Sequence, residues 1–390
     1  MALSFYRPRP SGGALAQVDR PSAAMAPEAL VAAAAARAAF QPIPFAPKGP
    51  APYRLDLAAV LGQGPVDAIR AAGRMTFHSC GDTGGIRDPK PQALVARGME
   101  RSFADGTNRA SFFYHLGDVV YFMGQRSEYF GQFYDAYEHY PAPIFALGGN
   151  HDGQTGPGSS RSLDGFEQNF CAPPGTYTPE ASDTGRMAMI QPYAYWCLDT
   201  PLAYFIGLYT NVPEGGEIDA DQRAWFRGQM AAAPTDKALI LSLHHPIYSF
   251  DNFHSGSADM AREVEGAINA SRRVPNLILT AHVHNYQRIE KPVATGILPL
   301  FVMGNGGYWN LHKLIAAPGH HDPATGSTLV AATANRHGFA TFDITRDRIE
   351  GRFTVVPETL SDPEENETFD TFSYPATVLK LGTGDTVKLA

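Results

Sequence analysis

The sequence has few cysteines, no long apolar run and no cluster of basic residues. Its 390 residues include three cysteines, Cys80, Cys171 and Cys197, an odd number that cannot all pair within one chain. A disulfide framework is therefore excluded as the main support of the fold. A single Cys171–Cys197 bridge is one alternative, and buried free thiols are the other, which we favour.

No apolar run reaches the roughly 18 residues that a transmembrane helix needs, so no membrane span is predicted. The first residues show no charged leader followed by an apolar core and a cleavage site. The Ala-rich run 32–39 is broken by Arg37 and indicates a helix rather than a signal peptide. By default these features predict a cytoplasmic protein.

Basic residues are scattered and outnumbered by acidic ones. Lysine and arginine total 31 against 39 aspartates and glutamates, which gives a formal net charge of −8. Because nucleic-acid backbones require grouped cations, nucleic acid is not predicted as the main partner. A small phosphorylated substrate stays compatible with this charge, because bound metal ions can dominate the local field.

Composition divides the chain into three regions. Residues 1–70 are rich in Pro, Ala and Gly without a strand pattern, and we expect an irregular N-terminal extension. Residues 71–357 show strand and helix patterns and are expected to form the main domain. Residues 358–390 form a C-terminal tail, acidic and then apolar, to which the sequence assigns no structure.

Strand and helix patterns succeed one another within residues 71–357, as in an α/β fold. Helical spacing is found near 91–104, 130–137, 219–230 and 260–268. Two strands are expected within 193–209, and further strands at 300–303, 339–344 and 349–355. Short apolar runs predict buried strands at 75–79, 111–115, 144–147, 238–243 and 276–281.

Residues of types that commonly bind metal ions follow the ends of these five apolar strands. They are Asp82, Asp118 with Tyr121, Asn150, His244, and the pair His282 and His284. Each has a simpler explanation when taken alone, such as a turn residue or a hydrogen-bonded core histidine. Taken together they lie where ligands collect in open α/β sheets, and their groups suit Zn, Mn and Fe. The pattern predicts two metal ions about 3.5–4 Å apart, an arrangement that supports displacement at phosphorus.

The same residues carry a family resemblance. The blocks GDTGG, GDVVY, GGNHD, HHPIYS and AHVHNYQR resemble, in order and spacing, those of the calcineurin-like metallophosphoesterases, and most closely the purple acid phosphatases. The resemblance covers about residues 74–356. It implies a four-layer α/β/β/α sandwich of two mixed sheets flanked by helices, with residues 71–357 as the catalytic domain. Purple acid phosphatases are typically exported, which makes a periplasmic or secreted location the alternative to the cytoplasm.

One departure within the first block favours the purple acid phosphatases. Most of the superfamily has Asp-x-His there, with the histidine on the first metal, whereas this chain has Gly84 at that position. Tyr121, three residues after Asp118, matches the replacement ligand of the purple enzymes.

The resemblance implies two ligand sets that share Asp118. The first metal, Fe(III), would bind Asp82, Tyr121 and His284, and the second, Fe(II), Zn or Mn, would bind Asn150, His244 and His282. The first set has three anionic groups and suits a trivalent ion, whereas the second is mostly neutral.

Further residues would act on the substrate according to the resemblance. His151, His245 and His254 would face it, with Asp152 orienting His151 as a proton donor to the leaving group. A metal-bound hydroxide would attack a phosphomonoester. Two alternatives stay open: a phosphodiesterase of the same superfamily acting on nucleotides or phospholipid head groups and, more remotely, a non-catalytic metal-binding scaffold.

Overall fold

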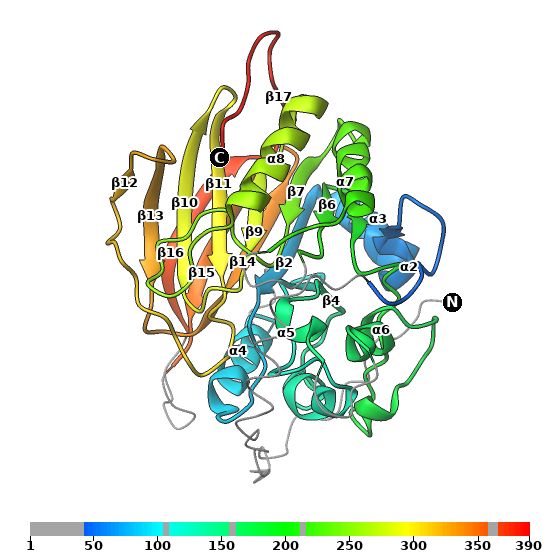
Figure 1. Ribbon diagram of the computed structural model, residues 1–390. Coiled ribbons are helices and arrows are strands. Elements are labelled where there is room, and N and C mark those ends of the chain that lie inside the picture. Colours follow the sequence, from blue (N-terminus) through cyan, green and yellow to red (C-terminus); the bar gives the residue numbers. More distant parts are fainter. Residues whose placement is uncertain (1–42, 104–108, 156–160, 211–215, 358–365) are drawn as a thin grey trace.

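Two large β-sheets lie face to face with helices outside them (Figure 1). This computed structural model describes residues 43–103, 109–155, 161–210, 216–357 and 366–390. Both sheets are mixed, and the predicted four-layer α/β/β/α sandwich is confirmed.

The larger sheet has nine strands. In spatial order they are β1 (Arg54–Asp56), β5 (Trp196–Asp199), β6 (Ala203–Gly207), β7 (Ala238–Ser242), β9 (Leu277–Thr280), β11 (Gly296–Met303), β10 (Tyr286–Val293), β13 (Ser327–Thr333) and β12 (His321–Asp322). The four central strands β6, β7, β9 and β11 are parallel. Their carboxyl ends therefore meet at one edge of the sheet.

The smaller sheet has six strands. Their order is β16 (Glu367–Pro375), β15 (Arg348–Val355), β14 (Gly338–Thr345), β2 (Arg74–Cys80), β3 (Phe113–His115) and β4 (Ile144–Ala146). Here β2, β3 and β4 are parallel, and the other three strands are antiparallel. A separate two-stranded ribbon joins β8 (Arg273–Val274) to β17 (Leu379–Lys380).

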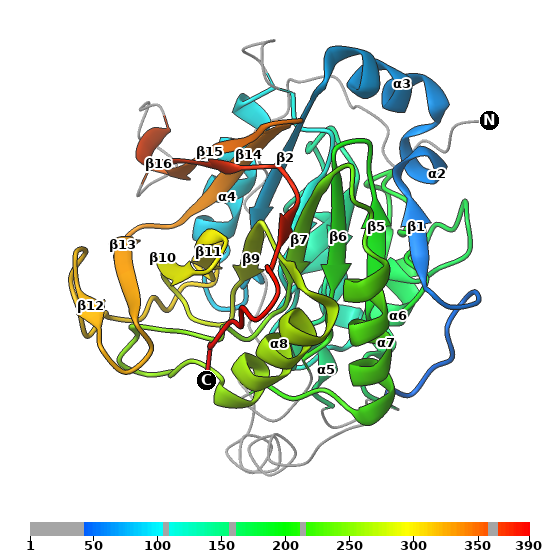
Figure 2. The same ribbon diagram turned by 90° about the horizontal axis from the view of Figure 1, so that it is seen from above.

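Helices cover the sheets and link their strands. The α-helices are α2 (Leu57–Leu61), α3 (Gln63–Ala72), α4 (Lys90–Arg101), α5 (Asn150–Gly153), α6 (Asp164–Phe170), α7 (Ala220–Ala232) and α8 (Ala258–Ser271). Figure 2 shows α7 and α8 side by side along the outer face of the nine-stranded sheet. Within the described residues, no helix combines the length and the apolarity needed to cross a membrane.

Aromatic side chains fill the space between the two sheets. Phe205 on β6 meets Phe77 on β2 edge-on with ring centroids 5.3 Å apart, and Phe301 on β11 meets Phe342 on β14 at 5.5 Å. Side chains of β7 alternate between this core and a second one beneath α7 and α8. Burial on both faces explains why this strand is a continuous apolar run in the sequence.

The N-terminal part of the described chain is more regular than its composition predicts. Residues 54–72, most of which were expected to be irregular, form β1, α2 and α3, and β1 pairs in parallel with β5. The expectation of an irregular segment is therefore wrong for residues 54–70. The strand β1 was not predicted because three residues are too few to show a strand period. Residues 1–42 lie outside the described residues, and the domain boundaries stay a prediction.

Two further expectations meet the structure in different ways. The aromatic stripe 130–137 faces the core, but its backbone begins as a π-helix (Phe130–Tyr134) rather than an amphipathic α-helix, and a 3₁₀ turn (Arg126–Glu128) precedes it. All three cysteines are buried and free, as favoured from their number.

Candidate metal centre

The loops after β2, β3, β4, β7 and β9 converge where the carboxyl edges of the two sheets meet. The Gly81 N–H, beyond β2, donates to the Met303 carbonyl of β11 at 2.9 Å. The His244 ring, beyond β7, bonds through Nδ1 to the Leu116 carbonyl beyond β3 at 2.8 Å. These bonds hold the loops of one sheet against those of the other.

A first group of donor atoms gathers around Asp82. The Tyr121 hydroxyl lies 3.0 Å from Asp82 Oδ1 and 3.3 Å from His284 Nε2. His284 Nε2 is in turn 3.4 Å from Asp82 Oδ1. The other nitrogen of His284, Nδ1, bonds to the Asn310 carbonyl at 2.9 Å, which orients Nε2 toward this group.

A second group gathers around Asp118. His244 Nε2 lies 3.3 Å from Asp118 Oδ2 and 3.2 Å from Asn150 Oδ1, and Asn150 Oδ1 is 3.0 Å from His282 Nδ1. Ligand atoms of Asp118, His244 and His282 all lie within 4.8 Å of one another. The bond from His244 Nδ1 to Leu116 leaves Nε2 directed at the group.

The backbone is strained at three of these positions. Asp82, Asp118 and His282 have positive φ values of 55°, 53° and 65°, a region that L-residues rarely adopt. Such strain persists only where the surrounding structure enforces it, and it is concentrated at functional sites. Gly149 is required beside them, because a Cβ on it would lie 2.1 Å from Asp118 Oδ1.

The Tyr121 side chain is fixed by its neighbours. Its backbone N–H donates to the Gln132 side-chain oxygen at 2.9 Å, and its carbonyl accepts from the amide nitrogen of the same side chain. Its ring stacks on Tyr308 with centroids 4.1 Å apart. Neither Gln132 nor Tyr308 was predicted, because their sequence positions carry no metal-ligand pattern.

His151 and Asp152 are both near the site, but their relation differs from the one expected. The His151 ring is oriented by a bond of 2.8 Å from Nδ1 to the Phe122 carbonyl. The Asp152 carboxylate instead accepts backbone N–H groups, from Val119 at 3.1 Å, Val120 at 3.3 Å and Gly149 at 2.8 Å. Asp152 therefore orders the loop that carries Asp118 and Tyr121.

A cavity of about 160 Å³, the metal-site cavity, opens above both groups. Of the three histidines expected to face the substrate, His151 and His254 line this cavity, whereas His245 does not. His245 is buried against His282, with its Nδ1 2.8 Å from the Thr210 hydroxyl. The full lining is Asp118, Phe122, Asn150, His151, Phe253, His254, His282, His284, Tyr308, Asn310 and His312.

The buried charges and donor atoms fit bound cations. Asp82 and Asp118 are completely or almost completely buried, and buried carboxylates are costly unless paired. Burial would raise the pKa of Asp118, but His244 and His151 hold it well below its usual range. Burial raises the pKa of Tyr121 well above its usual range, and Asp82 and Asp118 raise it further. A cation among these oxygens would stabilise all three anionic forms.

Comparisons with known proteins identify the family to which the chain belongs. A sequence profile of the calcineurin-like phosphoesterase family matches residues 75–286, more than half of the chain. Among curated proteins, none matches the sequence significantly.

Two solved structures illustrate the fold that this chain shares with known proteins. One is GAP50, the anchor in the inner membrane complex of Plasmodium, with a TM-score of 0.56, 14% identity, and coverage of 78% of this chain and 89% of that one. The other is purple acid phosphatase PPD1 from yellow lupin (Lupinus luteus) seeds, with a TM-score of 0.55, 17% identity, and coverage of 77% and 53%. At these identities the likeness shows the fold alone. The profile match, however, shows that the chain belongs to the calcineurin-like phosphoesterase family and is a hydrolase.

Proposed function

We propose that this protein is a dinuclear metal-dependent phosphatase, similar to the purple acid phosphatases, that hydrolyses phosphomonoesters. The observation that carries the proposal is the convergence of seven side chains from five loops into two adjacent donor groups. Both groups contribute residues to the lining of one open cavity, His284 from the first and Asp118, Asn150 and His282 from the second.

The donor sets support a different metal at each position. Asp82, Tyr121, His284 and the shared Asp118 offer three anionic groups, which suit Fe(III). Asn150, His244, His282 and Asp118 offer one shared carboxylate and neutral ligands, which suit Fe(II), Zn or Mn. When bound, two such ions supply Lewis-acid stabilisation of phosphate oxygens and a water of lowered pKa.

Two histidines that line the cavity are assigned to act on the substrate, one as the proton donor to the leaving group and one in phosphate binding. His151 is held by the Phe122 carbonyl, so its ring keeps one orientation while the substrate binds. We assign its Nε2 to hold the proton that the departing alkoxide takes up. His254 lines the same cavity with its ring 4.5 Å from that of His282, and it is assigned to bind a phosphate oxygen.

The experiment is release of 4-nitrophenolate from 4-nitrophenyl phosphate and from bis(4-nitrophenyl) phosphate after chelation and reloading with iron and zinc. We expect the monoester to be hydrolysed faster, and activity to vanish on chelation and return on reloading. With ethyl phosphate as substrate, whose alkoxide must take up a proton to leave, His151→Gln should lower kcat by roughly 10²–10⁴-fold without changing the metal content. The matched control is His139→Gln at an exposed histidine, which should behave like the wild type. Faster hydrolysis of the diester, or no hydrolysis by the metal-loaded protein, would contradict the proposal.

A further inference from the structure

Phe253 is an exposed aromatic side chain at the metal-site cavity. It is 72% exposed, the largest value among the exposed large apolar side chains that the structure describes. It lines the cavity together with the ligand histidines His282 and His284. Moving a phenyl ring out of water lowers the free energy. A ring that is exposed to solvent at a binding site is therefore available to pack against an apolar part of a ligand.

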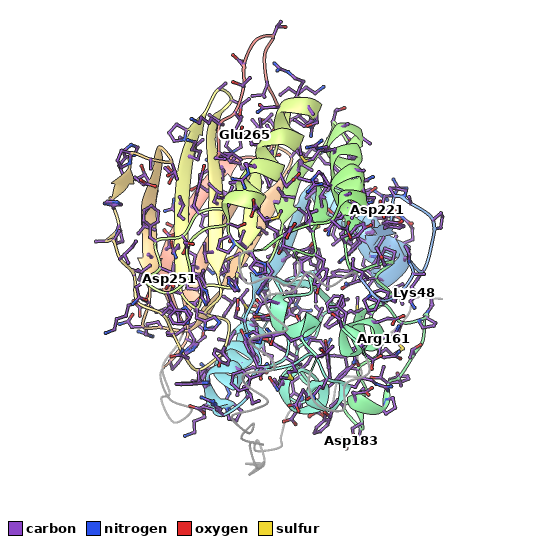
Figure 3. All side chains as sticks on the ribbon, in the orientation of Figure 1. Lys48, Arg161, Asp183, Asp221, Asp251 and Glu265 are labelled. Atoms are coloured by element: carbon purple, nitrogen blue, oxygen red, sulfur yellow. The ribbon has the colours of Figure 1, made fainter. Side chains whose placement is uncertain are left out.

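Buried neighbours hold this ring in place. The Phe253 N–H donates to Asp251 Oδ2 at 2.8 Å, and the next N–H, of His254, donates to the same oxygen at 2.8 Å. Asp251, labelled in Figure 3, is buried and also accepts the Asn285 amide at 2.9 Å. The Phe253 ring meets the rings of His254 at 4.7 Å and His312 at 5.1 Å. Its outward face is thus presented by an ordered turn.

The size of the cavity places the leaving group near this ring. At about 160 Å³ the cavity is smaller than the roughly 300 Å³ at the lower end of ordinary small-molecule sites. It has room for a phosphate group next to the ligands, while a bulky alcohol must extend toward its rim. A second aromatic ring, Phe122, also lines the cavity, 6.2 Å from the ring of His151 and with the Arg87 guanidinium 5.0 Å from its centroid.

We propose that the preferred substrates are phosphomonoesters whose leaving group carries a flat aromatic or heteroaromatic ring, and that this ring stacks on Phe253. The inference rests on the proposed phosphatase function and names its substrate class. Offset or edge-on contact between two aromatic rings stabilises the complex by more than the burial of their surface area alone. An aliphatic group of equal size lacks this additional stabilisation. Phe253 is accordingly a specificity-determining residue.

The test compares benzyl phosphate, cyclohexylmethyl phosphate and ethyl phosphate as substrates of the metal-loaded protein. All three release primary alcohols, so differences in kcat/KM report recognition of the leaving group rather than its chemistry. We expect kcat/KM for benzyl phosphate to exceed that for cyclohexylmethyl phosphate by roughly 3- to 10-fold. Phe253→Ala should reduce this ratio to about one, and Phe253→Trp should keep or increase it.

A matched control is Phe369→Ala on β16, an exposed phenylalanine that does not line the cavity and should leave the ratio unchanged. Equal kcat/KM values for the benzyl and cyclohexylmethyl esters in the wild type would overturn the proposal. A preference that survives Phe253→Ala would also overturn it. In both cases hydrolysis of ethyl phosphate would leave the phosphatase function standing, whereas failure to hydrolyse any of the three esters would overturn both.

Discussion

The ring of Tyr121 occupies the space beside Gly84. A methyl group built on Gly84 would lie 2.8 Å from Cδ2 of Tyr121 and 2.5 Å from Oε1 of Gln132. Gly84 is the position at which the family resemblance places a histidine ligand, and the Tyr121 ring fills the room beside this position. From there its hydroxyl reaches Asp82 at 3.0 Å. The lack of a side chain at position 84 therefore leaves the space in which the Tyr121 ring packs.

Substituting Gly84 by alanine should displace Tyr121. The added methyl group has no room unless the Tyr121 ring or the Gln132 amide moves, and such overpacking costs about 1–3 kcal/mol of unfolding free energy. We expect Gly84→Ala to lower stability in urea unfolding by this amount and to reduce iron binding. Gly228→Ala on α7 is the control, because a Cβ there meets nothing within 4 Å, and it should be neutral or slightly stabilising. Equal stability of the Gly84 variant and the wild type would contradict the steric argument.

Asp152→Asn should weaken the loop that carries Asp118. The two oxygens of Asp152 accept N–H groups of Val119, Val120 and Gly149, and an amide nitrogen in place of either oxygen leaves a buried donor without an acceptor. We expect a loss of about 1–3 kcal/mol in unfolding free energy and a weaker affinity for both metals. The exposed Asp67→Asn serves as the control. If the metal content and stability of the Asp152 variant match those of the wild type, the assigned role is wrong.

His78 should make the protein sensitive to acid. Its ring is buried on β2, with Nδ1 3.0 Å from the Tyr140 hydroxyl and Nε2 3.1 Å from that of Ser102. Burial, together with the positive charge of Arg352, lowers the pKa of His78 from 6.5 to about 3. The folded state thus binds fewer protons than the unfolded state between these values. Stability is complete above pH 6.5 and is lost as the pH falls toward 3, by about 1.4 kcal/mol per unit.

The measurement is the unfolding free energy in urea at several pH values from 4 to 7. His78→Gln should show a shallower acid loss than the wild type, because glutamine does not titrate. The exposed His139→Gln should leave the slope unchanged. Parallel curves for the His78 variant and the wild type would refute this assignment.

The sequence predicts those parts of the fold that are buried on both sides. β7 and β9 appear as apolar runs because each packs on the other sheet and on helices. β16 shows no such run, since most of its side chains are exposed at the sheet edge. Regular structure at Arg54–Asp56 was missed for a related reason, because three residues with one buried side chain carry no period.

The site could be predicted as a set of residues but not as a set of contacts. His244 and His245 are the same residue type at adjacent positions beyond β7, yet His244 joins the Asp118 group and His245 bonds to Thr210. The Gln132 side chain bonds to the backbone N–H and C=O of Tyr121 on another loop. Such bonds depend on spatial approach, and no sequence spacing indicates them.

The most direct test of the proposed dinuclear, iron-containing centre is metal analysis with a visible absorption spectrum of the purified protein and of Tyr121→Phe. This variant removes only the hydroxyl that lies 3.0 Å from Asp82 and keeps the ring stacked on Tyr308. The account predicts two metal ions per chain, at least one of them iron, and a phenolate-to-iron band that disappears in Tyr121→Phe but persists in Tyr308→Phe. A colourless wild-type protein holding two zinc or manganese ions, or a band that survives Tyr121→Phe, would contradict it.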